Sequence, residues 1–561
     1  MRHTGLFWRS CAMVVLAVAL IALGYPVAFV VTHGFDPTGW PNEFNTPTTW
    51  FSALHARPLG TLFATYWSMA HGASPEFAGG GTLQVFFVVV SLIVATPVVV
   101  FGGKMMVPRH PSGIYGSTDW ASSRDLARYN RGLEIGLDPA TKQRVRVRVE
   151  GNLLTIAPPR TGKTTGFIIP NLAYPERNAW CGPAVVIDPK GDAFFAVRRR
   201  REALGKTVRC LDPLGLVGGK DRWNPLLRIS ATDVLSMQAV ARSLLPNSGH
   251  SSDNSEYFTI SAVDVIVGAM IATIKDGHPD PVGAARLLLS TAELRDALAH
   301  NVDDASKAAL EILNMEERSR DQILASARQA TQWLRDTKMQ SVVKAHTFEM
   351  TDLLSGAMDL FIVMPADEMK KKILAPYVRW LLSDLFAAFR SGRAKERVLV
   401  FVDEANVLGK FDALLDGAGE LPGYGVSLWT IWHSRSQIAG LYGETGAETM
   451  QATAEVVNLF NLSRTLPDEN EHWSKAIGSF TGYSSTSTTD KSGAKTESTG
   501  AAEIRLVLAT DLPQLLQKHQ IVFLTSPNHT TSPIKLARTQ AHKDPRFKGL
   551  IVPRPPIGKI Q

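Results

Sequence analysis

The segment from residue 153 to residue 165 constrains the fold of this 561-residue chain more than any other. Residues 153–156 form a mainly apolar run that predicts a buried strand. The loop 157–164, Ala-Pro-Pro-Arg-Thr-Gly-Lys-Thr, follows directly and precedes an apolar helix. This order matches the phosphate-binding loop pattern, with Ala157 in place of its first glycine. Because ligands of α/β folds lie at the carboxyl ends of parallel strands, we predict an α/β domain that binds a nucleotide at this loop.

The residue types in the loop suit a nucleotide and a metal ion. Backbone N–H groups of the loop and of the helix N-terminus would surround the phosphates. Lys163 would reach the β- and γ-phosphates, and the Thr164 hydroxyl would hold Mg²⁺. The predicted nucleotide-binding residues are Ala157, Pro158, Pro159, Arg160, Thr161, Gly162, Lys163, Thr164 and Thr165. A Gly-Lys-Thr tripeptide can also be a plain turn, but the flanking apolar segments favour a site for ATP and Mg²⁺.

A second motif lies far downstream. Residues 398–402, Val-Leu-Val-Phe-Val, form a β-prone run that ends in Asp403 and Glu404. A buried parallel strand would present both carboxylates at the edge of the sheet where ligands bind. Asp403 can then hold the water shell of Mg²⁺, and Glu404 can polarise the attacking water. Together with the loop, this motif predicts an ATPase.

Two apolar runs, residues 11–32 and 83–102, predict a membrane anchor. Each has about 20 residues, enough for a helix to cross a hydrocarbon layer of about 30 Å. Arg9 precedes the first run and Lys104 follows the second, which indicates cytoplasmic termini and an external loop at 33–82. The alternative for the first run is a cleaved signal peptide. The net charge of +7 arises after residue 103, which is compatible with nucleic acid or anionic lipid.

Several further segments, in their order and spacing, resemble the type IV secretion coupling proteins of the TraG/TraD kind. The resemblance covers about residues 113–546, and the two-span N-terminus matches as well. The segments that carry it, besides the loop and Asp403-Glu404, are 115–121, 169–172, 185–192, 212–213, 223–226, 423–425 and 434–437.

This resemblance implies a RecA-like P-loop motor domain, interrupted by an inserted all-α domain and working as a ring, with a homo-hexamer expected. The expected division is a membrane anchor (1–104), a nucleotide-binding domain in two pieces (105–230 and 351–546), the all-α domain (231–350) and a tail (547–561). The local pattern agrees, because helix-like segments at 256–275 and 318–335 replace strand patterns, which resume at 359–364.

The resemblance also implies an activity and partners. The chain is expected to be an ATPase of the bacterial inner membrane that feeds substrate into a type IV secretion channel. The expected partners are channel components and either a relaxase–DNA complex, effector proteins or both. DNA, single- or double-stranded, would be bound through its phosphates without sequence preference. An ATP-gated receptor for protein cargo remains the alternative, and a translocase of the FtsK kind is less favoured because its linker and DNA-reading module have no counterpart.

Two positions depart from the family pattern. His433 stands where a glutamine usually senses the γ-phosphate. Pro422 stands where the family usually has a basic residue, which is a candidate to act across the ring. Arg435 or Arg464 are candidates to replace that basic residue. The catalytic set predicted in this way is Lys163, Asp403, Glu404 and His433; Gln437 joins the nucleotide-binding residues, and Thr164 and Asp403 are the expected Mg²⁺ ligands.

Two other segments allow a structural and a functional interpretation. The run Arg198–Arg201 indicates either a solvated or lipid-facing helix surface or a contact with the phosphates of DNA in a central pore. Residues 481–500, rich in Ser, Thr and Gly, predict a flexible loop, with a moving pore loop as the alternative.

Overall fold

The computed structural model describes residues 26, 29–30, 36–37, 46–71, 109–245, 253–489 and 495–552. The chain divides into two compact units, Met1–Arg109 and His110–Gln561. The predicted spans 11–32 and 83–102 lie almost wholly outside the described residues and stay predictions.

The first unit contains two described helices between the predicted spans, α2 (Pro47–Ala56) and α3 (Pro58–His71). Thr46 caps α2, and Pro47 begins it, where a missing N–H costs nothing. The buried indole of Trp50 donates a hydrogen bond to the hydroxyl of Thr65 on α3, over 2.9 Å. This contact joins the two helices into a small hairpin.

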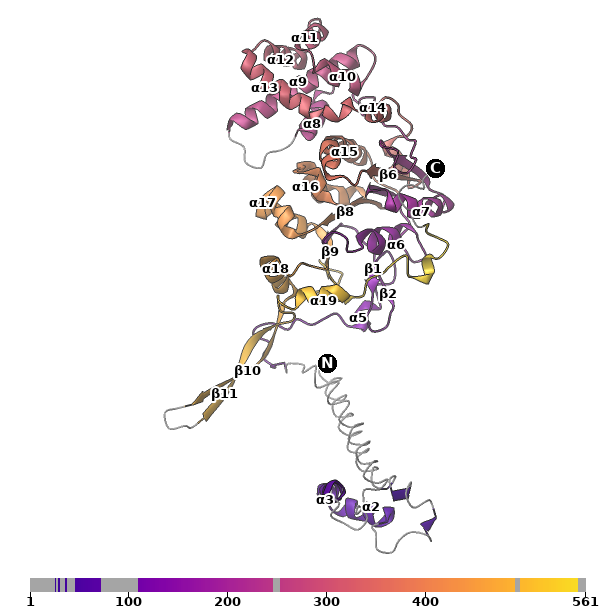
Figure 1. The fold of residues 1–561 in the computed structure, drawn as a ribbon, viewed down its shortest axis with the longest axis vertical. Helices are drawn as coiled ribbons and strands as arrows, with labels where there is room; N and C mark the ends of the chain where they lie inside the picture. The colour runs from indigo at the N-terminus through magenta and orange to yellow at the C-terminus, as the bar shows by residue number, and fades with distance from the viewer. Residues whose placement is uncertain are drawn as a thin grey trace. The chain divides into compact units, whose positions relative to one another are not determined.

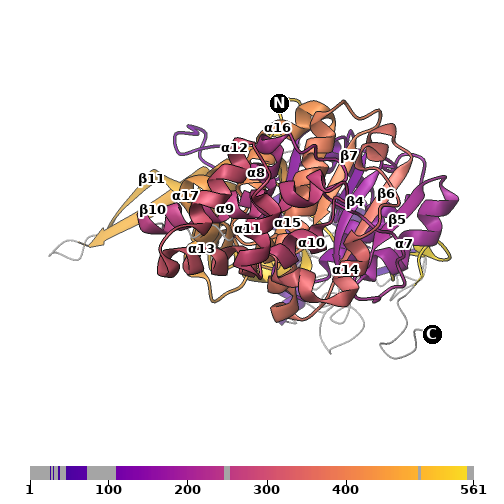
Figure 2. The same ribbon diagram turned by 90° about the horizontal axis from the view of Figure 1, so that it is seen from above.

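The second unit is built around a nine-stranded mixed sheet in the order β13-β12-β9-β3-β8-β7-β4-β6-β5. Figure 2 shows β7, β4, β6 and β5 side by side. Strands β3 to β9 pair in parallel, and β12 and β13 add an antiparallel edge. The strands are β3 (Asn152–Ile156), β4 (Ala184–Pro189), β5 (Thr207–Leu211), β6 (Met358–Met364), β7 (Val398–Val402), β8 (Val426–Trp432), β9 (Ala454–Phe460), β12 (Gln520–Leu524) and β13 (Ile534–Leu536). The predicted α/β class is therefore confirmed.

Both faces of this sheet are covered. In β4, Val185 and Ile187 pack into one apolar cluster and Ala184 and Val186 into the other, so alternate residues serve opposite faces. One face carries α5, β1, β2, η3, α6 and α7; the other carries α15, η6, α16, η7, α17, α18 and α19. Their bounds are α5 (Ser123–Leu126), β1 (Leu133–Leu137), β2 (Arg144–Val147), η3 (Thr164–Ile168), α6 (Ile169–Leu172), α7 (Asp192–Ala203), α15 (Glu368–Arg390), η6 (Ala405–Leu408), α16 (Asp412–Glu420), η7 (Leu421–Tyr424), α17 (Arg435–Ala452), α18 (Pro467–Ile477) and α19 (Leu512–Lys518).

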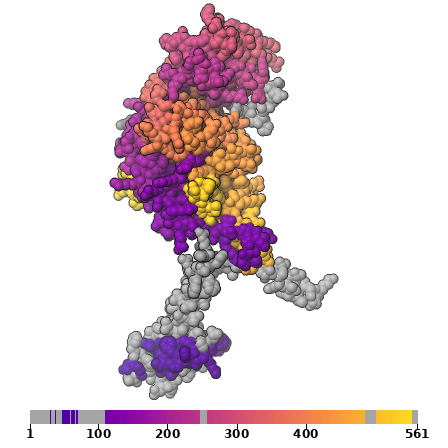
Figure 3. All heavy atoms as spheres, turned by 180° about the vertical axis from the view of Figure 1, so that it is seen from behind, coloured from indigo at the N-terminus to yellow at the C-terminus, as the bar shows by residue number. Residues whose placement is uncertain are grey.

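Between β5 and β6 a loop is followed by a series of helices in the described chain, and these helices pack as one lobe, magenta to red in Figure 3. They are α8 (Val234–Leu244), α9 (Asp253–Lys275), α10 (Pro281–Leu287), α11 (Thr291–Leu298), α12 (Asp304–Leu313), α13 (Glu317–Ala330), η4 (Gln332–Arg335), α14 (Thr337–Val343) and η5 (Met350–Ser355). Its central helix, α9, contains Glu256–Lys275, the one described helix long and apolar enough to cross a membrane. In this segment 61% of the apolar window is buried within the protein. The apolar character of α9 is therefore accounted for by the core of the helical lobe.

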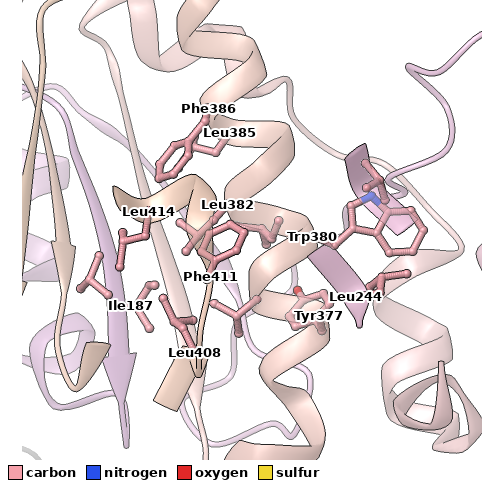
Figure 4. Packing of buried hydrophobic residues seen from close by; sticks show 14 of the residues in the cluster. Ile187, Leu244, Tyr377, Trp380, Leu382, Leu385, Phe386, Leu408, Phe411 and Leu414 are labelled. Carbon is pink, nitrogen blue, oxygen red and sulfur yellow. The ribbon is translucent and has the colours of Figure 1, made fainter. Parts of the chain in front are cut away.

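Helix α15 lies between the sheet and the helical lobe. In Figure 4, Leu382 and Phe386 of α15 lie on the side of the helix that faces Leu414 and Ile187, whereas Trp380 and Tyr377 lie near Leu244 of α8. The indole of Trp223 adds a hydrogen bond of 2.9 Å to Asp384 on α15. One helix thus packs against both the sheet and the inserted helices.

The prediction of a flexible loop at residues 481–500 is wrong for the described part. Strands β10 (Ser479–Thr489) and β11 (Lys495–Arg505) pair antiparallel over eleven residues each, and the hairpin extends from the body of the second unit (Figure 1). Backbone hydrogen bonds fix the base of the hairpin: the N–H of His110 donates to the carbonyl of Thr481, and the N–H of Thr118 donates to the carbonyl of Ser479. A composition of Ser, Thr and Gly suggests low complexity, but β-branched threonine favours extended backbone once a partner strand is available.

The arginine run on α7 divides between core and surface. The guanidinium of Arg201 is fully buried and donates to both carboxylate oxygens of Asp359 on β6. Arg200 donates to the carbonyls of Ala173 and Tyr174, which leaves Arg198 and Arg199 exposed. The phosphate-contact interpretation is therefore wrong for Arg201, which has no access to DNA.

Candidate nucleotide-binding site

The loop after β3 turns through two left-handed residues, Arg160 (φ 59°) and Gly162 (φ 84°). Glycine adopts this conformation at little cost, which explains Gly162. Ala157, by contrast, does not adopt a left-handed conformation; it is buried, and its N–H donates to the carbonyl of Trp432 on β8 over 2.7 Å. The alanine is therefore tolerated at the first position of the pattern.

The helix after the loop begins with a π-helical turn, η3, before it continues as α6. Pro170 in α6 has no N–H to donate to a carbonyl one turn back, so a wider first turn accommodates it. Such turns are frequent at functional sites. Here the π-helical turn begins at Thr164, directly after Lys163, so both residues lie at the start of the helix.

Lys163, Thr164 and Asp403 lie together at the carboxyl edges of β3 and β7. The Lys163 ammonium is buried, 3.4 Å from the carbonyl oxygen of Ala157, and the Thr164 hydroxyl donates to Asp403 over 3.2 Å. Burial lowers the pKa of Lys163, although the charges of Asp403 and Glu404 oppose this shift. The lysine is thus surrounded by compensating carboxylates.

The residues present fit a divalent cation. Oδ1 of Asp403 is buried and has no hydrogen-bond partner among the described residues, while Oδ2 accepts from Thr164. Burial raises the pKa of Asp403, with Lys163 acting in the opposite direction. A nearby carboxylate oxygen and hydroxyl are oxygen ligands of the kind that Mg²⁺ prefers.

A cavity of about 1130 Å³ opens beside these groups. Its lining includes Pro159 to Thr165 of the loop, Lys190 and Asp192 after β4, and the pair Asp403 and Glu404. Ala157, Pro158, His433 and Gln437 do not line it. The structure therefore brings most of the predicted residues together and leaves these four outside the cavity wall.

The opposite wall comes from residues 541–552, which sequence reasoning missed. This segment is anchored by Arg546, whose guanidinium pairs with the buried carboxylate of Glu134 at 2.8 Å and with Asp544 at 2.7 Å. The N–H of Ala541 also donates to the carbonyl of Thr165. No local pattern marks the segment, because it reaches the loop only through tertiary contacts.

Glu404 follows β7 with a left-handed backbone, φ 59° and ψ 52°. Its carboxylate pairs with the ammonium of Lys371 on α15, which also lies 3.0 Å from Glu368. Burial by itself would lower the pKa of Lys371. The hydrogen bonds to Glu404 and Glu368 outweigh burial, so the pKa is raised. No sequence pattern distinguishes Lys371 from Lys370 and Lys372.

His433 and Gln437 contact each other just after the end of β8. The N–H of His433 donates to the Gln437 side chain over 3.0 Å, and the two side-chain nitrogens lie 3.3 Å apart. Burial and the charge of Lys163 lower the pKa of His433. His433 is therefore close enough to the loop to feel its charge without lining the cavity.

The two candidates to replace the basic residue that is absent at Pro422 differ in their ion pairing. Arg435 pairs with Glu444 at 2.7 Å, whereas Arg464 is exposed in the loop after β9 and makes no ion pair with a described residue. Strands β9 and β3 are parallel neighbours, so Arg464 lies at the same sheet edge as the loop. Pro422 precedes β8, at the opposite edge.

Comparison with known families decides the relationship. A model of the family described as type IV secretory system conjugative DNA transfer matches residues 137–553. This chain belongs to that family. The resemblance inferred from the sequence motifs is thus confirmed.

The chain is similar to Protein VirD4 of Rhizobium rhizogenes, with 26% identity over 437 residues that cover 73% of this chain and 63% of that protein. It is also similar to the conjugal transfer protein TraG of Escherichia coli, with 27% identity over 427 residues, 66% of this chain and 65% of that protein. The matches thus span just under two thirds of the length of these relatives.

Solved structures show the same fold. The bacterial conjugative coupling protein TrwBdeltaN70 superposes with a TM-score of 0.58 at 19% identity, over 79% of this chain and 98% of that one. The plasmid coupling protein TrwB in complex with ADP and Mg²⁺ gives a TM-score of 0.57 at 19% identity, over 77% and 95%. The α/β fold of the second unit is therefore a TrwB-like fold.

Proposed function

We propose that this chain is an inner-membrane ATPase that couples substrate recruitment to transfer through a type IV secretion channel. The observation that carries the proposal is the convergence of Lys163, Thr164, Asp403 and Glu404 on one cavity large enough for a nucleotide. Membership of the conjugative DNA-transfer family supplies the transport context.

The arrangement supports hydrolysis by positioning and charge. Loop N–H groups and the Lys163 ammonium would bind the β- and γ-phosphates, and Thr164 and Asp403 would hold Mg²⁺. The bound ion would neutralise charge on the phosphate oxygens. Glu404 would take a proton from water as that water attacks the γ-phosphorus, and the bond to the β–γ bridging oxygen breaks. TrwB has been solved in complex with ADP and Mg²⁺ and with a non-hydrolysable ATP analogue, which supports ATP and Mg²⁺ as the molecules bound at this site.

The proposed working form is a membrane-anchored ring, with six copies as the expected number. An exposed Arg464 at the sheet edge that bears the phosphate loop supports action across a subunit boundary. In such a ring an arginine from the neighbour can raise turnover by several orders of magnitude. The two predicted spans would fix the ring to the inner membrane, and the helical lobe would be available for cargo.

A second candidate is an ATP-gated receptor for protein cargo with little DNA pumping. It is favoured by Pro422 and His433, because neither supplies the usual basic residue or glutamine. In that case ATP acts as a conformational switch, and the cargo signal binds to the helices between β5 and β6.

ATP turnover by the full chain in detergent, with and without single-stranded DNA over a salt series, tests the proposal. Lys163→Ala serves as the blank, and Lys307→Ala, which removes an exposed lysine of the helical lobe, as the matched control. Stimulation by DNA that falls steeply with salt and is absent only from the blank supports the motor. Nucleotide binding without turnover, together with DNA-independent cargo binding, would support the receptor instead.

A further inference from the structure

Three consecutive lysines, Lys370–Lys372, lie near the start of helix α15, and only the middle one is buried. Lys370 and Lys372 are exposed, whereas the side chain of Lys371 is 3% exposed. Lysine near a helix N-terminus opposes the helix dipole, and burying an ammonium is unfavourable unless it is paired. A buried lysine at this position therefore needs a specific compensating partner.

The compensation comes mainly from Glu404. Lys371 contacts two carboxylates, but Glu368 is 73% exposed and Glu404 only 25% exposed. An exposed ion pair is worth little because water screens it, so the contact with Glu404 dominates. The raised pKa of Lys371 keeps this ammonium charged at neutral pH.

Glu404 has few other restraints. Its left-handed backbone is unfavourable for a residue with a side chain, and no side-chain cap holds the start of η6. Asp403 and Glu404 line both the large cavity and a second cavity of about 10 Å³, and Lys371 lines only the second. That volume is at the lower limit for one water molecule. Glu404 therefore lies between Lys371 and the nucleotide cavity.

We propose that Lys371 is a positioning residue that holds the Glu404 carboxylate in the wall of the nucleotide cavity, so that α15 sets the orientation of the general base. This inference rests on the proposed ATPase activity. It assigns no contact between Lys371 and the nucleotide, because the lysine approaches from behind the carboxylate. Loss of Lys371 should thus lower kcat and leave nucleotide affinity unchanged.

The test is a kinetic double-mutant cycle with the full chain in detergent. Lys371→Met should lower kcat by about tenfold to a hundredfold, less than the full contribution of about 10²- to 10⁴-fold that is typical of a general base, while KM and the Kd of a fluorescent ADP analogue change less than about twofold. Lys371→Arg should restore part of the rate. Lys372→Met removes an exposed lysine from the same turn and should match the wild type.

The decisive comparison uses Glu404→Gln as background. If Lys371 acts through Glu404, Lys371→Met should change the residual single-turnover rate of the Glu404→Gln variant by less than about twofold. An equal loss in both backgrounds, or faster turnover of Lys371→Met alone, would overturn the inference. A wild type that binds ATP without turning it over would overturn the ATPase proposal as well, whereas an active wild type with an unchanged Lys371→Met variant would overturn only this inference.

Discussion

Removing either partner of the Arg201–Asp359 pair should strongly destabilise the second unit, whereas removing both partners together should not. Neither side chain is exposed to solvent. The guanidinium donates to the two carboxylate oxygens over 2.7 and 2.8 Å and to the carbonyl of Gly182 over 2.6 Å. The Ala184 N–H of β4 also donates to Asp359. The pair therefore joins α7, β4 and β6 inside the sheet.

The expected loss of unfolding free energy follows from the complete burial of both charges. Arg201→Met leaves a buried carboxylate without its cation, and Asp359→Leu leaves a buried guanidinium without its anion; each should cost about 3–5 kcal/mol. The double variant replaces both charges by apolar groups and should lose far less than the sum, because replacing a buried pair is often close to neutral. Arg199→Met, on the exposed face of the same helix, should change stability by less than about 0.5 kcal/mol.

Urea unfolding of a fragment of residues 110–561, followed by circular dichroism, measures these differences. DNA binding by the same variants provides a second readout. If Arg201→Met weakened DNA binding without lowering the urea midpoint, Arg201 would be a phosphate contact and the buried pairing would be refuted. Equal destabilisation by Arg201→Met and Arg199→Met would refute it too.

Three further predictions concern the nucleotide-binding loop and its surroundings. Ala157→Gly should lower stability by about 0.5–1 kcal/mol in urea, because no left-handed backbone is needed there, while a titration gives an unchanged Kd for ATP. Arg546→Ala should raise that Kd several-fold and lower the urea midpoint, since it releases the segment that forms one cavity wall; unchanged affinity would contradict this role. Because the pKa of His433 lies below its usual value of about 6.5, the imidazole is neutral at pH 7 and gains a proton only in more acidic solution. His433→Gln and the wild type should therefore show parallel profiles of ATP turnover between about pH 6.5 and pH 8, and a decline confined to the wild type would contradict the shift.

Sequence reasoning succeeded where chemistry and local structure coincide. The loop 157–164 and the pair Asp403-Glu404 each lie next to an apolar strand, so their placement at one sheet edge follows from the parallel pairing of β3, β8 and β7. The helix expected at 256–275 is α9, because a long apolar stretch without strand punctuation leaves few alternatives.

It failed where the partner is distant or the composition misleads. Lys371 is one of three similar lysines, and only the tertiary fold distinguishes the buried one. The cavity wall at 541–552 depends on Arg546 reaching Glu134, more than 400 positions away. Residues 481–500 suggested a loop because they lack apolar alternation, although pairing of β10 with β11 needs only backbone groups.

Helix α15 connects the helical lobe with the wall of the nucleotide cavity. Besides Lys371 it carries Arg379, a buried guanidinium that donates to the carbonyls of Ser243 and Leu244, at the end of α8, and of Leu408, at the end of η6. Burial lowers the pKa of Arg379 to about 10, and its acceptors are neutral carbonyls at helix ends, where the helix dipole favours a cation. The guanidinium therefore stays satisfied only while α8 and η6 keep their present separation. Since η6 begins immediately after Glu404, a shift of α8 relative to η6 would disturb the segment that follows the proposed general base. In this arrangement, α15 contacts both the helical lobe and Glu404 in the wall of the nucleotide cavity.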